Sequence, residues 1–125
     1  MAHVLWIALG GGAGAVCRYS VSKYTTGIWL GMFPVGTFLV NIVGCFFLGF
    51  FSVVFSRMIV PVHMKGLVSV GFLGAFTTFS TYSLETVSLL QEGEWALGAV
   101  NVIASTFIGL IMVVAGIWTA RLLLS

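Results

Sequence analysis

Long apolar runs, in which charged residues are almost absent, limit how this chain can fold. The run "FLVNIVGCFFLGFFSVVF" at residues 38–55 carries no charge, and over the whole chain 60% of residues are hydrophobic and 6% are charged. A soluble domain carries about 25% charged residues, because water must solvate its surface. A transmembrane β-barrel would alternate apolar and polar residues in segments of about ten. The runs therefore predict an all-α integral membrane protein.

The length of 125 residues limits the number of membrane spans. A spanning helix needs about 20 mostly apolar residues and each connection needs a few more, so four helices fit and five do not. In the first apolar segment, Gly10 and Gly14 have the GxxxG spacing that lets a second helix approach closely. Within a single transmembrane domain, 1–125, we expect helices at about 4–22, 36–55, 66–90 and 95–123. Three aromatic residues are expected at lipid headgroup level: Tyr19, Tyr24 and Trp29.

The cations near the helix ends give little indication of orientation. Arg57, Lys65 and Arg121 fall on the side of the two termini, and Arg18 and Lys23 fall on the other side. Orientation follows the excess of Lys and Arg on one side, so two interpretations stay open. The chain has one weakly determined topology, or it inserts both ways and oppositely inserted copies form an antiparallel dimer. The net charge of +2, without a basic run, excludes a nucleic-acid partner.

The third apolar segment is unusual because polar and small residues occupy what should be the middle of the bilayer. A continuous helix facing lipid would not carry them, so the segment predicts a helix broken near 74–78. The backbone carbonyls freed by a break must be satisfied by protein, water or a cation. A break also exposes a helix N-terminus, whose N–H groups favour anions. The residues concerned lie in "GFLGAFTTFSTYSLE": Gly71, Gly74, Thr77, Thr78, Ser80, Thr81 and Ser83.

Two aromatic residues and one acid follow the predicted break on one helix face. Phe79 and Tyr82 are three residues apart, and the edges of their rings are electropositive. A ring edge can contact a small anion, although core packing is the more common reason for a phenylalanine here. Glu85 lies one further turn along, where it could cap charge near a pore mouth or pair with a cation.

Four other polar residues lie in or beside the apolar segments, where polar groups are costly unless they have partners or line a wet cavity. The amide of Asn41 can bond another helix or donate N–H groups to an anion. Asn101 and Ser105 are four residues apart and form a polar stripe that invites the same two interpretations. Arg18 can reach the lipid headgroups or line a vestibule that attracts anions.

Catalysis is not expected, because the sequence has no nucleophile and base pair, metal-ligand cluster or phosphate-binding loop. Two other non-enzymatic functions can be compared with anion transport. A small multidrug or cation exchanger would need a carboxylate in the first helix for proton coupling, and this first helix has none. If the chain only assembled with other proteins, the polar break would have no function.

Three stretches of this sequence resemble the Fluc fluoride channels, also called the CrcB family: "GGGAGAVCRY", "PVGTFLVNIVGCFFLG" and "GFLGAFTTFSTYSLE". The match extends over all four segments, and the string TTFSTxSxE after a glycine pair is rare outside that family. The resemblance implies a dual-topology antiparallel homodimer of four-helix subunits in the bacterial inner (plasma) membrane. It further implies two fluoride pores, one central structural sodium ion, and passive export of cytoplasmic fluoride that gives fluoride resistance.

The resemblance also implies roles for individual residues. Asn41 is expected to be the pore amide and Phe79 the aromatic whose ring edge meets fluoride. The backbone carbonyls of Gly74 and Thr77 are expected to hold the sodium ion, two from each subunit. Six further residues are expected in the vestibule, at the pore mouth, at the break and on the fourth helix: Arg18, Glu85, Ser80, Thr81, Asn101 and Ser105.

The chain departs from the family pattern at three positions. Family members often have a second phenylalanine where this chain has Tyr82, whose hydroxyl adds a donor to the ring edge. The polar track of the fourth helix usually starts with a tyrosine and ends with a serine, whereas this chain has Asn101 and Gly109. We therefore expect an outer track that is wetter or lined by backbone. Hydroxyls, an amide and ring edges can replace the water of a fluoride ion and still let it leave, as conduction requires.

Overall fold

The structure, a computed structural model, describes residues 2–26 and 31–125, and all regular structure in these ranges is helical. Four stretches are long and apolar enough to cross a membrane. The chain is therefore a multi-pass helical membrane protein. The four stretches are His3–Thr25, Val35–Arg57, Val62–Gln91 and Trp95–Leu123.

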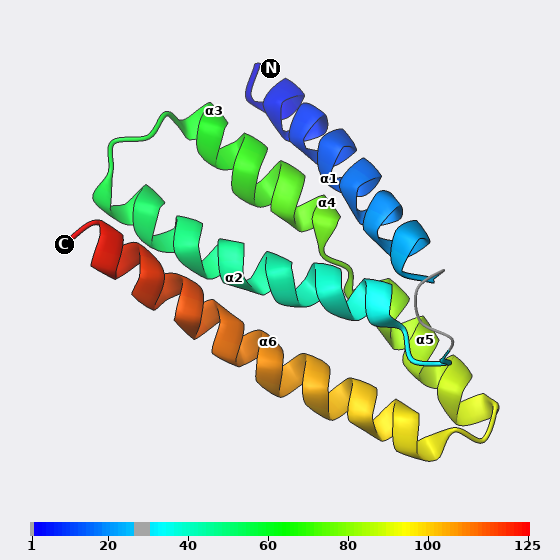
Figure 1. Ribbon diagram of the computed structural model, residues 1–125. Helices are drawn as coiled ribbons and strands as arrows, with labels where there is room; N and C mark the ends of the chain where they lie inside the picture. The colour runs from blue at the N-terminus through cyan, green and yellow to red at the C-terminus, as the bar shows by residue number, and fades with distance from the viewer. Residues whose placement is uncertain (1, 27–30) are drawn as a thin grey trace.

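The third stretch is divided into several helical pieces, whereas each of the other three is one helix (Figure 1). The two termini and the loop after α2 lie at one end of the molecule, and the loops before α2 and before α6 lie at the other end. The helices are α1 (Ala2–Thr26), α2 (Val35–Arg57), α3 (Val62–Lys65), the π-helix η1 (Gly66–Leu73), α4 (Gly74–Phe76), α5 (Phe79–Gln91) and α6 (Trp95–Leu123).

The helices pack mainly as two parallel pairs, α1 with η1 and α2 with α6. Glycines bring the members of each pair together, because a side chain would block the approach of the backbones. A Cβ atom on Gly10 or Gly14 would collide with carbonyls of the third stretch, and one on Gly49 or Gly116 would collide with a carbonyl across the α2–α6 contact. The close approach predicted from the GxxxG spacing of Gly10 and Gly14 is confirmed.

Three of the four helical stretches extend further than the sequence suggests. The polar segment after residue 22 continues α1 to Thr26, because hydroxyls such as that of Thr25 bond backbone carbonyls one turn earlier and need no other partner. The second and third stretches begin directly after prolines, at Val35 and Val62, and α2 continues to Arg57. The fourth helix has the expected range, 95–123.

Few of the described side chains are buried within the chain, and large apolar side chains are exposed along every long helix. In a bilayer such surfaces face lipid or a second protein chain. Tyr19 and Tyr24 are exposed towards the end of α1, as expected for residues at headgroup level. Trp29, for which the same expectation was made, lies outside the described residues.

The π-helix η1 was not anticipated from the sequence. Its N–H groups bond carbonyls five residues earlier, as the Gly74 N–H does with the Ser69 carbonyl. Gly66 and Gly71 are buried within it, and Gly71 lies against the Ile7 carbonyl of α1. Such wide turns are rare and are frequent at functional sites, and this one leads directly into the interruption of the third stretch.

Candidate functional site at the break in the third span

The helix of the third span is interrupted at Thr77 and Thr78, within the range 74–78 predicted from the sequence. Both residues are extended, with φ and ψ of −83° and 154° at Thr77 and −149° and 115° at Thr78. The Thr78 hydroxyl accepts a hydrogen bond from the Thr81 N–H at 3.2 Å and so caps the start of α5. It also donates to the Thr81 hydroxyl at 2.9 Å. Threonine side chains therefore stabilise the helix start that the break creates.

Asn41 of α2 holds the break from the side. Its Oδ1 accepts from the Thr78 N–H at 2.8 Å, and its Nδ2 donates to the Thr78 carbonyl at 3.1 Å. Of the two interpretations made from the sequence, interhelical hydrogen bonding is the one present in the protomer. An amide nitrogen carries two N–H groups, and the contact with Thr78 uses one of them. Donation to an anion by the other stays a prediction.

The carbonyls of Gly74 and Thr77 lie where the helical hydrogen-bond ladder stops. Among the described residues, the last backbone bond before the break runs from the Thr77 N–H to the Leu73 carbonyl at 3.1 Å, and no recorded backbone bond crosses from α5 to Gly74 or Thr77. Carbonyl oxygens without N–H partners are suited to a hard cation such as sodium. The residues present therefore fit the sodium site that the family resemblance implies.

Phe79 projects from the break, and its side chain is 79% exposed. Its ring lies 5.7 Å from that of Tyr82, centroid to centroid, with the ring planes tilted by 43°. The expectation that these two residues share a helix face is confirmed. Core packing within the chain does not account for a ring exposed to this extent. Phe79 also lines a cavity of about 230 Å³ together with Asn41, Thr77 and Thr78.

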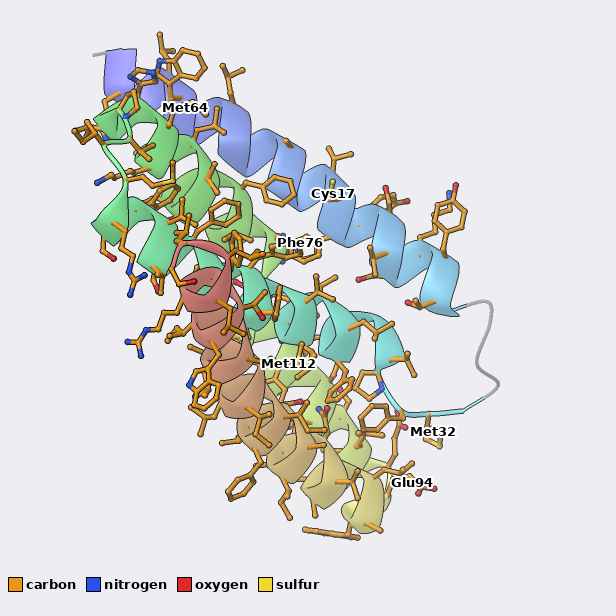
Figure 2. The ribbon with its side chains drawn as sticks, turned by 60° about the vertical axis from the view of Figure 1, so that its left-hand side comes forward. Cys17, Met32, Met64, Phe76, Glu94 and Met112 are labelled. Carbon is orange, nitrogen blue, oxygen red and sulfur yellow. The ribbon has the colours of Figure 1, made fainter. Side chains whose placement is uncertain are left out.

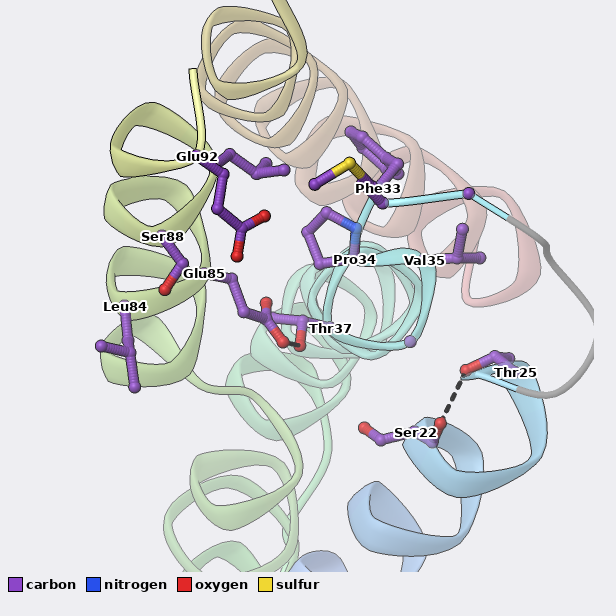
Figure 3. Close-up of a pocket in the computed structure, with 14 residues that line it drawn as sticks. Ser22, Thr25, Phe33, Pro34, Val35, Thr37, Leu84, Glu85, Ser88 and Glu92 are labelled. Atoms are coloured by element: carbon purple, nitrogen blue, oxygen red, sulfur yellow. Dashed lines mark hydrogen bonds between the residues drawn. The ribbon is translucent and has the colours of Figure 1, made fainter. Parts of the chain in front are cut away.

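Glu85 lies on α5 beside a larger cavity of about 400 Å³ near one end of the molecule (Figure 3). Its Oε1 accepts a hydrogen bond from the Thr37 hydroxyl of α2 at 2.8 Å. Its Oε2 is buried without a hydrogen-bond partner among the described residues. Sequence reasoning did not single out Thr37. Thr37 lies one turn before Asn41 on the same face of α2. That spacing could have indicated from the sequence that Thr37 also faces the third span.

The polar stripe of α6 is hydrogen-bonded to α5. Asn101 is 1% exposed, and its Nδ2 donates to the Thr86 hydroxyl at 2.9 Å. Thr86 in turn donates to the Tyr82 carbonyl at 2.8 Å, and the Ser105 hydroxyl donates to Asn101 Oδ1 at 3.4 Å. The sequence analysis did not single out Thr86, because its partner Asn101 lies on another helix.

The remaining predicted residues lie near the break without a common contact. The Ser80 hydroxyl is 3.4 Å from that of Thr78. Arg18 is half-buried on α1, one turn beyond Gly14, in the part of α1 that packs against the third span. Gly109 faces Cys45 of α2, whose sulfur would lie 3.5 Å from a Cβ at that glycine.

These features define a class of protein. It is a small multi-pass membrane protein whose third span is interrupted by polar residues, and a side-chain amide from a neighbouring helix bonds the backbone at the interruption. Comparison with known proteins identifies the family within that class. The family model described as "CrcB-like protein, Camphor Resistance (CrcB)" matches residues 5–117, and the chain belongs to the CrcB family.

Relatives in this family match over nearly their whole length. A protein of Maridesulfovibrio salexigens named fluoride-specific ion channel FluC is 43% identical over 126 residues, covering 100% of both chains. A protein of Magnetococcus marinus with the same name is 45% identical over 123 residues, covering 97% of this chain and 99% of the relative.

Proposed function

We propose that this protein is a fluoride-selective passive ion channel that exports cytoplasmic fluoride and so gives fluoride resistance. The observation that carries the proposal is the polar break, where Thr78, Thr81 and Asn41 lie together in an otherwise apolar molecule. Relatives that match end to end are named fluoride-specific ion channels. The function is therefore that of an ion channel and not of an enzyme, in agreement with the expectation from the sequence.

Fluoride gives up its water only if close hydrogen-bond donors replace it. Asn41 supplies the amide N–H that its contact with Thr78 does not use. Phe79 and Tyr82 supply ring edges beside it, which attract an anion without a fixed charge. The hydroxyls of Ser80 and Thr81 lie at the same break. These neutral groups bind weakly enough for the ion to move on.

Four more residues continue this route towards the membrane faces. Arg18 attracts anions into a vestibule by its charge, and Glu85 lies at the pore mouth beside the cavity of Figure 3. Asn101 and Ser105 continue the route on α6. Asn101 is buried against Thr86, where its amide supports α5, so Ser105 presents the more accessible polar group of the two.

The working unit of this proposal is an antiparallel homodimer with two pores in the bacterial inner (plasma) membrane. Gly74 and Phe79 are exposed at the break. A polar break facing lipid would be costly, and a second copy crossing at this point would cover it. The cations at the helix ends divide three against two, which allows insertion in both orientations.

The same proposal places one sodium ion at the centre of the dimer. The carbonyls of Gly74 and Thr77 from both copies would hold it, because the helical bonds that would otherwise use these oxygens stop at the break. A bound cation supplies a fixed positive charge that offsets the repulsion between carbonyl oxygens brought together.

Removing sodium tests this site. Exchange of sodium for N-methyl-glucamine throughout purification is expected to lower fluoride efflux about tenfold, equivalent to about 1.4 kcal/mol, because that cation is too large for a ring of four carbonyls. Adding sodium back to the same sample should restore efflux. Full efflux in sodium-free samples would contradict a sodium ion at the break.

Fluoride efflux from liposomes tests the function itself. Liposomes that contain the purified protein and potassium fluoride should release fluoride when valinomycin lets potassium leave, and liposomes loaded with potassium chloride should not. The driving force is the same in both, so the difference measures selectivity. Absence of fluoride release, or equal release of chloride, would overturn the proposed function.

A further inference from the structure

One end of the molecule carries cations without any acidic side chain. Arg57, Lys65 and Arg121 lie at or near the last residues of α2, α3 and α6, at the end that holds the two termini, whereas the acids of the chain fall between Glu85 and Glu94. Figure 2 shows Glu94 at the opposite end from Met64, the neighbour of Lys65. Lys65 Nζ donates to the Phe55 carbonyl at 3.0 Å, and an Arg57 guanidinium nitrogen donates to the Leu124 carbonyl at 3.4 Å. These contacts hold both cations at the level where the helices end.

An apolar groove is lined by α1, α2 and η1. It lies in the same half of the molecule as these cations. Its volume is about 390 Å³, and its lining is almost entirely hydrocarbon. Leu9 at its edge is 65% exposed, so the groove opens to the surface. Residues from three helical segments line it: Leu9 and Ala13 of α1, Phe47 and Phe51 of α2, and Val68 and Phe72 of η1.

The walls of the groove lead to the basic end. On α2, Phe51 stacks on Phe55 at 5.5 Å between ring centroids, and the Phe55 carbonyl accepts the bond from Lys65. Arg57 follows two residues later. On the η1 side, Leu67 lines the groove two residues after Lys65. The groove walls therefore lead towards Lys65, whereas Arg57 turns to the end of α6.

We propose that this groove binds an anionic phospholipid, with one acyl chain along the groove and the phosphate headgroup on Lys65. Cations beside a membrane surface attract anionic lipids, and basic pockets between membrane helices bind their headgroups. The apolar lining matches an acyl chain, and the Lys65 ammonium matches the phosphate. The site is separate from the polar break and makes no use of its residues.

The direction of the groove favours a lipid over a second copy of the chain. The exposed side of the third span near the break carries Val70 and Gly74, whereas Val68 and Phe72, which line the groove, lie on the other side of η1. A second copy covering the break would leave the groove facing lipid.

Native mass spectrometry of the full-length protein tests the proposal, with phosphatidylglycerol and phosphatidylcholine of the same acyl chains supplied in equal amounts. The protein is expected to retain phosphatidylglycerol at least about fivefold more than phosphatidylcholine. Lys65→Gln should reduce that preference about fivefold, the effect of one cation near an anionic surface. Ala13→Phe, which fills the groove, should reduce retention of both lipids.

Matched variants distinguish lipid binding at this site from general effects of substitution on the protein. Lys23→Gln removes an exposed cation at the other end, and Val114→Phe enlarges an exposed apolar side chain on α6, so neither should change lipid retention. Each variant is first checked for a wild-type circular dichroism spectrum. Equal retention of the two lipids by the wild type would overturn the proposal, as would unchanged retention in Ala13→Phe. Displacement of the lipid by glycerol phosphate at equal concentration would also overturn it, since the acyl chain would then contribute nothing.

Discussion

Replacing Phe79 by isoleucine is expected to lower fluoride efflux about tenfold while leaving the protein folded. The Phe79 ring is 79% exposed in the protomer, so its removal costs little packing within the chain. What is lost is the electropositive ring edge beside Asn41 and Thr78. An aromatic edge contact is worth about 1.4 kcal/mol, which corresponds to a factor of ten in rate. Efflux from potassium fluoride liposomes under valinomycin measures the effect.

Phe107→Ile is the matched control for this variant. Phe107 is 63% exposed on α6, and the substitution is chemically the same. The control should conduct like the wild type, and both variants should elute as the wild type does in size exclusion. Wild-type efflux in Phe79→Ile would reject the ring-edge role and leave Phe79 as a contact for lipid or for a second copy.

The sequence allowed the break to be predicted because its composition conflicts with its surroundings. Threonines and serines clustered as in "GAFTTFSTYS" are unusual in a continuous helix that faces lipid, and the helix is interrupted at Thr77 and Thr78, as predicted. Gly10 and Gly14 likewise predicted a close helix contact, because a glycine pair at that spacing has few other uses in a membrane. Both predictions rest on local patterns that a single segment carries by itself.

What could not be predicted are the partners that come from elsewhere in the chain. The contacts of Asn41 with Thr78, Thr37 with Glu85, and Asn101 with Thr86 join residues on different helices. Their pairing depends on how the helices rotate against one another, which the apolar pattern does not specify. The π-helix escaped prediction for a similar reason, since its wide turn depends on packing against α1.

Replacing Asn41 by leucine is expected to have the largest effect on both stability and efflux. The side chain has a similar size, but the Thr78 N–H and carbonyl lose the bonds of 2.8 Å and 3.1 Å that the amide provides. Each buried backbone group without a partner costs about 1–3 kcal/mol, so the variant should lose about 2–6 kcal/mol. That loss is a large part of a total stability of about 5–15 kcal/mol. We expect a lower midpoint of thermal unfolding and no fluoride efflux.

Asn101→Leu is the matched control for stability. It removes the same amide from α6, but its partner Thr86 keeps a hydrogen bond to the Tyr82 carbonyl at 2.8 Å, so no backbone group is left unsatisfied. The thermal midpoint should therefore fall less than in Asn41→Leu. Equal destabilisation by the two leucine variants would contradict the importance of the backbone contact at the break.

Asn41→Asp separates the support of the break from contact with fluoride. In its protonated form the acid accepts from the Thr78 N–H and donates to the Thr78 carbonyl, so the variant should be more stable than Asn41→Leu. It has no second N–H to donate to the ion, and fluoride efflux should still be lost. Efflux at the wild-type rate in a folded Asn41→Asp protein would mean that the amide only holds Thr78. Loss of efflux without loss of folding would place the same side chain on the path of the ion.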